Sequence, residues 1–120
     1  MTYAVIGSRG FSNYPLLVDV LLNTLNFDIK YDHIVSGGAD GADCLARKFA
    51  EMNGFAETRR FTEFLPLWDK YGKAAGPIRN EKIIRACDEV VVFWDGNSAG
   101  TRSALKFAKK HKKPVHIYWF

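Results

Sequence analysis

Small and polar residues follow a long apolar run in the last third of the sequence. Residues 90–94 are all apolar, and Asp95 interrupts them. Such a run is typical of a strand buried on both faces of a parallel sheet. The residues that follow combine glycines with hydroxyl groups ahead of a helical pattern: Gly96, Ser98, Gly100 and Thr101. Because free N–H groups and the helix dipole attract anions at a helix N-terminus, we expect this loop to bind a phosphate-bearing ligand. Asp95 either recognises a base or sugar or caps the loop.

A second turn of small residues, formed by Gly7, Ser8 and Arg9, follows the first apolar segment. Glycine lets the backbone approach a ligand closely. Arginine binds a phosphate or carboxylate through two parallel hydrogen bonds. We therefore treat the three residues as ligand-binding candidates; the alternative is a plain turn with a surface arginine.

A third turn, within residues 36–43, follows the second apolar segment. Gly37 and Gly38 suit a chain that passes tightly over a ligand. Asp40 either accepts hydrogen bonds from sugar hydroxyls or caps the helix that follows. The turn is not the dinucleotide-binding fingerprint, because it lacks the G-x-G-x-x-G spacing and follows the second strand.

A fourth group of polar residues follows Pro77, which predicts the start of a helix. This start places Arg79, Asn80 and Glu81 in the first turn. A cation there opposes the helix dipole, so we expect Arg79 and its neighbour Asn80 to face an anionic ligand. Glu81 either complements the dipole or acts in catalysis, and it forms with Arg79 the candidate catalytic pair. The sequence shows no evident Ser/His/Asp or Cys/His arrangement.

Alternating strand and helix patterns position these turns. The expected strands cover residues 2–7, 33–36, 56–61, 89–94 and 115–120, and the expected helices cover 14–25, 42–52, 77–86 and 103–111. The alternation predicts one α/β, Rossmann-like domain over residues 1–120, with a five-stranded parallel sheet in the order 3-2-1-4-5 and helices on both faces. Ligands bind such sheets beyond the C-terminal strand ends, where the turns after strands 1, 2 and 4 converge.

The bulk properties exclude several classes of protein. The 120 residues are 48% apolar and 25% charged, as in ordinary globular domains. Neither a secretory signal nor an apolar run of the roughly 20 residues that span a membrane is evident, so we expect a cytoplasmic protein. Cys44 and Cys87 are expected to be buried free thiols rather than zinc ligands, and no metal or cofactor is expected. The net charge of +4 suits an anionic ligand, although the lysine-rich residues 106–113 are typical of a solvated helix end.

Four segments of the chain are similar to a known family. They are V-I-G-S-R at 5–9, S-G-G-A-D-G-A-D at 36–43, G-P-I-R-N at 76–80 and F-W-D-G-N-S-A-G-T at 93–101. Together they resemble the YspA-like branch of the SLOG superfamily, which also includes the Lonely Guy phosphoribohydrolases, the DNA-processing protein A group and molybdenum-cofactor carriers. The resemblance covers nearly the whole chain. It implies a Rossmann-like fold, a nucleotide or nucleotide-derived ligand, and a homodimer.

The match to the phosphoribohydrolases is incomplete. Their R-K motif is followed by P-G-G-x-G-T-x-x-E. Arg79 matches the arginine, Asn80 stands in place of the lysine, and Ala104 stands in place of the catalytic glutamate. We therefore expect a nucleotide-derived small molecule to be bound rather than cleaved. The alternatives are cleavage of the N-glycosidic bond of a nucleoside 5′-monophosphate and binding of single-stranded DNA, which the lysine run and remote kinship suggest.

Overall fold

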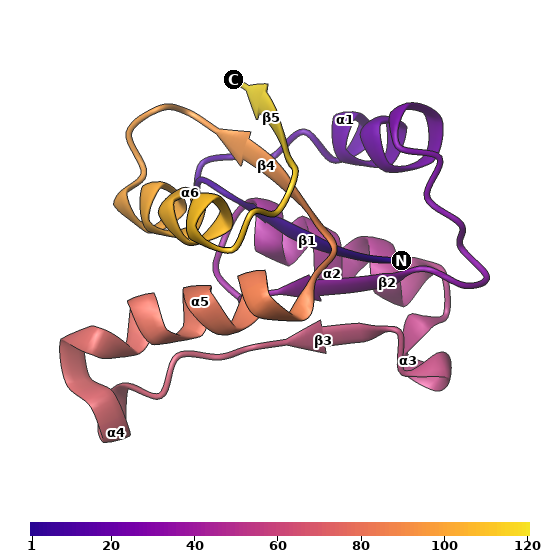
Figure 1. Ribbon diagram of the computed structural model, residues 1–120. Coiled ribbons are helices and arrows are strands. Elements are labelled where there is room, and N and C mark those ends of the chain that lie inside the picture. The colour runs from indigo at the N-terminus through magenta and orange to yellow at the C-terminus, as the bar shows by residue number, and fades with distance from the viewer.

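A five-stranded parallel sheet forms the centre of the protein (Figure 1). The computed structural model describes residues 1–120 except the side chain of Ala56. The strands are β1 (Thr2–Gly7), β2 (His33–Ser36), β3 (Phe61–Glu63), β4 (Glu89–Trp94) and β5 (Val115–Trp119). Their order is β3-β2-β1-β4-β5. The predicted α/β class and the predicted strand order 3-2-1-4-5 are therefore confirmed.

Helices cover both faces of this sheet. On one face lie α1 (Tyr14–Asp19), which continues as a π-helical turn over Val20–Thr24, and α2 (Ala42–Met52). On the other face lie α5 (Ala75–Ala86) and α6 (Ala99–Lys110). Each face has its own apolar cluster, one with Phe49 and Phe93 and the other with Ile84 and Val92. Alternate residues of β4 enter opposite clusters, which explains why residues 90–94 are continuously apolar.

The segment before β3 differs from the prediction of a strand at residues 56–61. A single helical turn, α3 (Phe55–Thr58), occupies the first half of it, and the strand begins only at Phe61. Gly54 and Arg59, which flank this turn, have left-handed backbone angles φ of 72° and 55°. Phe55 is fully buried against the core, so its tertiary packing, rather than the apolar character of the segment, determines the conformation.

Two helices begin earlier than expected. Helix α5 begins at Ala75 and not at Pro77, so Arg79 lies in its second turn and the argument from the helix dipole does not apply to it. A short helix, α4 (Trp68–Tyr71), and a 3-10 turn precede it. Helix α6 begins at Ala99 and not at residue 103, because the hydroxyl of Ser98 caps it by accepting from the N–H of Thr101.

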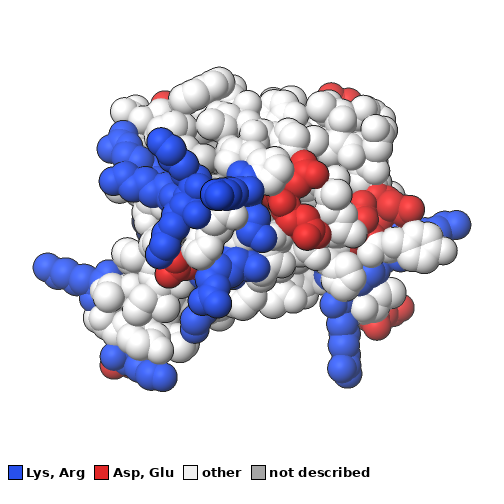
Figure 2. Space-filling model, in the orientation of Figure 1, with Lys and Arg blue, Asp and Glu red and all other residues white. Residues whose placement is uncertain are grey.

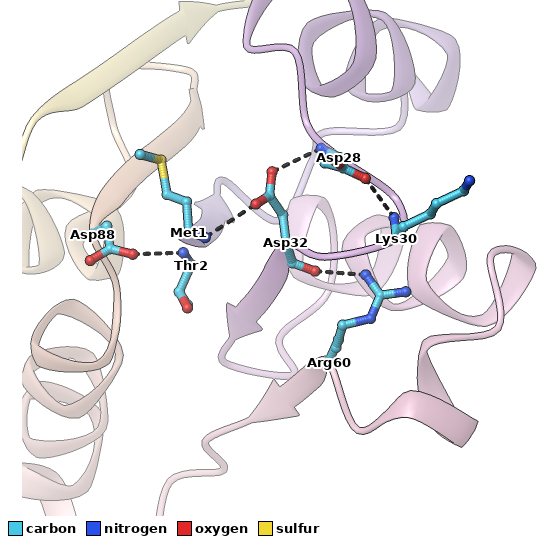
Figure 3. A network of polar contacts seen from close by, with 7 residues as sticks. All are labelled: Met1, Thr2, Asp28, Lys30, Asp32, Arg60 and Asp88. Atoms are coloured by element: carbon cyan, nitrogen blue, oxygen red, sulfur yellow. Dashed lines mark hydrogen bonds and ion pairs between the residues drawn. The ribbon is translucent and has the colours of Figure 1, made fainter.

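Polar contacts tie together the N-terminal ends of the strands (Figure 3). The carboxylate of Asp32 accepts from the amino group of Met1 at 3.1 Å and from the N–H of Asp28 at 2.8 Å. The guanidinium of Arg60 donates to the carbonyl oxygen of Asp32 at 2.9 Å. The carboxylate of Asp88 accepts from the N–H of Thr2 at 2.7 Å. These contacts lie at the opposite end of the sheet from the N-termini of α5 and α6 (Figure 1).

The structure bears on two expectations from composition, which concern membrane-spanning segments and the state of the two cysteines. Among the described residues, none of the helices combines the length and the apolar character needed to cross a membrane. Cys87 is a buried free thiol as expected, and its burial raises its pKa to about 11. Cys44 is exposed, contrary to the prediction, because it lies on the solvent-facing side of α2.

Candidate functional site

A cavity of about 480 Å³ opens beyond the C-terminal ends of β1 and β4. These neighbouring strands are the switch point of the sheet, because the chain order reverses between them. Residues from three of the predicted turns line the cavity: Gly7, Ser8, Arg9, Arg79, Asn80, Asp95, Ser98, Gly100 and Thr101. The wall also contains residues not predicted as ligand-binding: Ile6, Gly10, Ala39, Asp43, Ile83, Asn97, Ala99 and Ala104.

The loop between β4 and α6 is shaped by its own acidic residue. One oxygen of Asp95 accepts from the N–H groups of Asn97, at 2.8 Å, and Ser98, at 3.1 Å. These bonds, the one from Asn97 above all, lower the pKa of Asp95. The negative charge of Asp95 therefore stabilises the loop. Of the two roles considered for this residue, the geometry corresponds to capping.

The first turn of α6 offers donors to the cavity. The N–H groups of Ala99 and Gly100 have no intrahelical acceptor, as is usual for the start of a helix, and within the described residues no other acceptor meets them. Both residues line the cavity. This turn therefore combines free N–H groups with the positive end of the helix dipole, which is a favourable environment for an anion.

Ser8 connects the ends of β1 and β4. Its N–H donates to the carbonyl oxygen of Phe93 at 2.9 Å, and its hydroxyl oxygen accepts from the N–H of Asp95 at 3.0 Å. Ser8 is buried, whereas the next residue, Arg9, is exposed. Gly41, with φ of 81°, brings its backbone against the carbonyl groups of Ser8 and Arg9, where a Cβ would overlap them. The turn after β1 therefore has a fixed backbone and a free arginine side chain.

Arg79 connects the turn after β2 to the start of α6. Its Nη1 donates to the carbonyl oxygen of Gly37 at 2.6 Å, and its Nε donates to the side-chain oxygen of Asn80 at 2.9 Å. Asn80 in turn donates to the carbonyl oxygen of Gly100 at 3.3 Å. The side chains of Arg79 and Asn80, which form these hydrogen bonds, belong to residues that also line the cavity.

The two arginines at the cavity influence each other. Burial lowers the pKa of Arg79; the negative charge of Asp43 opposes this effect, and the positive charge of Arg9 adds to it. Among the described residues, Arg9 forms no ion pair. Two like charges therefore share one cavity, and an anionic ligand would relieve their repulsion.

Asp43 is a site residue that sequence analysis did not select. Its side chain is only 5% exposed, and its carboxylate accepts from the N–H of Gly37 at 2.8 Å. Burial raises its pKa to about 6, although the N–H groups of Gly37 and Ala39 and the charge of Arg79 act in the opposite direction. Asp43 holds the turn after β2 against α2. A contact across six residues to a glycine N–H leaves no signal in composition or periodicity.

The raised pKa of Asp43 predicts a specific dependence of stability on pH. Between its ordinary value of 3.8 and about 6, the folded protein binds more protons at this group than the unfolded protein does. Asp43 therefore makes the free energy of unfolding rise as pH falls through this window, and its charged form costs stability above it. We expect Asp43→Asn to be more stable, relative to wild type, at about pH 7 than at about pH 4.5. Urea unfolding of both proteins at the two pH values measures this difference, and a difference independent of pH would contradict the assignment.

Five predicted site residues lie outside the cavity wall: Gly37, Gly38, Asp40, Gly96 and Glu81. Gly37 lies behind Arg79 and Asp43, which both bond to it. Gly38 lies against Leu65, and Asp40 is exposed without capping α2 by a side-chain hydrogen bond. The carboxylate of Glu81 pairs instead with Lys110, the last residue of α6, at 3.2 Å, and with His111, which follows it, at 2.8 Å.

The fold of this chain has a counterpart among known protein structures. No family model matches the sequence. The fold is similar to that of DNA processing protein A from Helicobacter pylori, a protein that binds single-stranded DNA, with a TM-score of 0.71 and 23% identity. That similarity covers 98% of this chain and 64% of the other, so the chain spans less than two thirds of that protein. The Rossmann-like fold implied by the SLOG resemblance is therefore confirmed.

A closer match in sequence is the Gene 61 protein of Mycobacterium phage D29. The two are 33% identical over 115 residues, which cover 92% of this chain and 90% of the phage protein. Identity at this level over nearly the full length of both proteins indicates a common family. The chain thus belongs to the family of the phage D29 Gene 61 protein.

Proposed function

We propose that the protein binds single-stranded DNA and that the cavity at the end of β1 and β4 receives one of its phosphate groups. The observation that carries the proposal is the convergence of Arg9 and Arg79 on the free N–H groups at the start of α6. Asp43 and Asp95 also line the cavity, but their carboxylates accept hydrogen bonds from backbone N–H groups, whereas Arg9 forms no ion pair among the described residues. The cavity therefore offers hydrogen-bond donors, two guanidinium groups and free N–H groups, that match the oxygens of a phosphate.

The basic surface of α6, whose first turn lines the cavity, favours a strand over an isolated phosphate. Figure 2 shows Lys and Arg side chains gathered on the side of the molecule where α6 lies. Helix α6 and the turn after it contribute exposed basic residues: Arg102, Lys106, Lys109, Lys110 and Lys112. Such a surface attracts a polyanion over a longer distance than one site can. The likeness to the DNA-binding protein from Helicobacter pylori supports the same ligand class.

A free nucleotide is the second candidate ligand. The cavity volume of about 480 Å³ is within the range of small-molecule sites. Cleavage of such a nucleotide has weaker support. Ala104 lines the cavity at the position where the phosphoribohydrolases carry their catalytic glutamate, and Glu81 is engaged with α6.

Direct titration distinguishes the two candidates. A fluorescently labelled oligo(dT) is titrated at several salt concentrations, with a duplex of the same length and a nucleoside 5′-monophosphate as competitors. We expect the oligonucleotide to bind with an affinity that falls as salt rises, and the duplex and the mononucleotide to compete poorly. Binding of the mononucleotide without binding of the strand would favour the second candidate. No binding of oligo(dT) even at low salt would refute DNA binding.

Glu81→Gln provides a negative control for this assignment. The carboxylate of Glu81 contacts Lys110 and His111 and does not line the cavity. We expect the variant to bind oligo(dT) within about twofold of wild type, because exposed ion pairs contribute little. The titration of fluorescently labelled oligo(dT) measures this affinity. A loss of tenfold or more would show that Glu81 belongs to the binding site.

A further inference from the structure

Two tryptophans stack at the C-terminal ends of β4 and β5. Trp94 and Trp119 are direct neighbours in the parallel register, and their ring centroids lie 5.2 Å apart with an interplanar angle of 29°. Trp94 packs partly against the core, whereas Trp119 is 63% exposed. The pair therefore presents an aromatic ring to solvent from a rigid sheet.

The loop between β4 and α6 joins this pair to the cavity. Asp95, Asn97 and Ser98 line the cavity, while the intervening Gly96 faces Trp119, whose ring lies 3.6 Å from the position of a Cβ at Gly96. The exposed tryptophan and the phosphate-binding candidates are thus on two sides of one short loop.

A cation lies beside the ring of Trp94. The guanidinium carbon of Arg102 is 6.0 Å from the ring centroid of Trp94, and its Nη2 donates to the carbonyl oxygen of Gly96 at 3.3 Å. Exposed aromatic rings next to basic groups are the combination with which proteins bind single strands, since bases stack and phosphates meet the cations.

We propose that Trp119 stacks a nucleobase of the strand whose phosphate occupies the cavity. This inference rests on the proposed function and names a second subsite for the same ligand. A nucleobase fits this surface better than an apolar side chain does, because it is joined covalently to phosphates. Arg102 lies by the ring of Trp94, on which Trp119 stacks, and the cavity with its two arginines lies across the same loop. Any base can stack on Trp119, so this subsite would bind single strands without sequence preference.

The test compares a strand that has bases with one that lacks them. Wild type and Trp119→Ala are titrated with oligo(dT) and with an abasic strand of the same length. We expect Trp119→Ala to weaken oligo(dT) binding roughly 5- to 100-fold and to leave abasic binding unchanged. Trp119→Phe should retain most of the affinity for oligo(dT), since it keeps an aromatic face. Trp68→Ala is the matched control, because Trp68 is 56% exposed on α4, which lies away from this loop.

Each of the other outcomes excludes the stacking subsite, DNA binding or both. Equal losses for both strands, or unchanged oligo(dT) binding by Trp119→Ala, overturn the stacking subsite alone. Equal losses together with a change from dimer to monomer in sedimentation would show that the exposed end of β5 joins two copies of the chain. Absence of binding of either strand to wild type overturns the proposed function, and the subsite with it.

Discussion

Arg9→Ala is expected to weaken binding of oligo(dT) by roughly tenfold or more, the loss typical of one charge-assisted hydrogen-bonding group. Arg9 lines the cavity, is exposed, and forms no ion pair among the described residues. Its removal therefore leaves no buried group unsatisfied, and the fold should be unchanged. The slope of log affinity against log salt should also fall by about 0.7, as expected for one lost phosphate contact in a single strand.

The matched control for this variant is Arg85→Ala. Arg85 is exposed in the last turn of α5 and does not line the cavity, so the two variants lose the same net charge at different places. Arg85→Ala should change affinity only slightly. Arg79→Ala should weaken binding at least as much as Arg9→Ala, but it also removes the donor to Gly37 and needs a parallel measurement of stability. If Arg9→Ala and Arg85→Ala bind alike, the cavity is not where the phosphate binds.

Gly7→Ala is expected to destabilise the protein by roughly 3 kcal/mol or more, at the upper end of overpacking effects. A Cβ at Gly7 would overlap the carbonyl oxygen of Phe93 and lie 2.8 Å from the Cβ of Ala42. That carbonyl already accepts the N–H of Ser8, and Phe93 is fully buried in the sheet. The two strands cannot separate to make room for the Cβ without breaking the hydrogen bond from Ser8 to Phe93, which joins β1 to β4.

Gly10→Ala tests whether this loss comes from close packing rather than from glycine itself. Gly10 lines the same cavity three residues later, and a Cβ there would meet nothing within 4 Å. The midpoint of urea unfolding of Gly10→Ala should stay close to that of wild type. A midpoint for Gly7→Ala that also matched wild type would mean that β1 and β4 are less tightly joined than the structure indicates.

The sheet was predictable because its residues obey one simple pattern. Residues 90–94 are apolar because both faces of β4 are covered, and this burial is a property that a linear run can reveal. The turn at α3 was not predictable in this way, since its conformation depends on where Phe55 packs. The early start of α6 was missed because Gly100 and Thr101 resemble loop residues, and the cap at Ser98 becomes visible only with its partner.

The site was predictable only as far as its turns are local. Glycine-rich turns at strand ends must meet at one edge of a parallel sheet, so Ser8 and Asp95 could be brought together from strand order alone. The separate roles of the site residues could not be predicted from the sequence. The structure shows that Asp43 fixes a turn from a helix, and that Trp119, which an edge strand could equally bury, remains exposed.

The hydrogen bonds of Arg79 have a consequence for the entropy of binding. A long side chain loses up to about 2 kcal/mol of rotamer freedom when it is fixed. Arg79 has already lost much of this freedom on folding, because Gly37 and Asn80 hold its guanidinium. Arg9 is exposed and loses its freedom only when an anion arrives. Two identical charges in one cavity are therefore unequal: Arg79 is preorganised for its ligand, whereas the ligand must itself order Arg9.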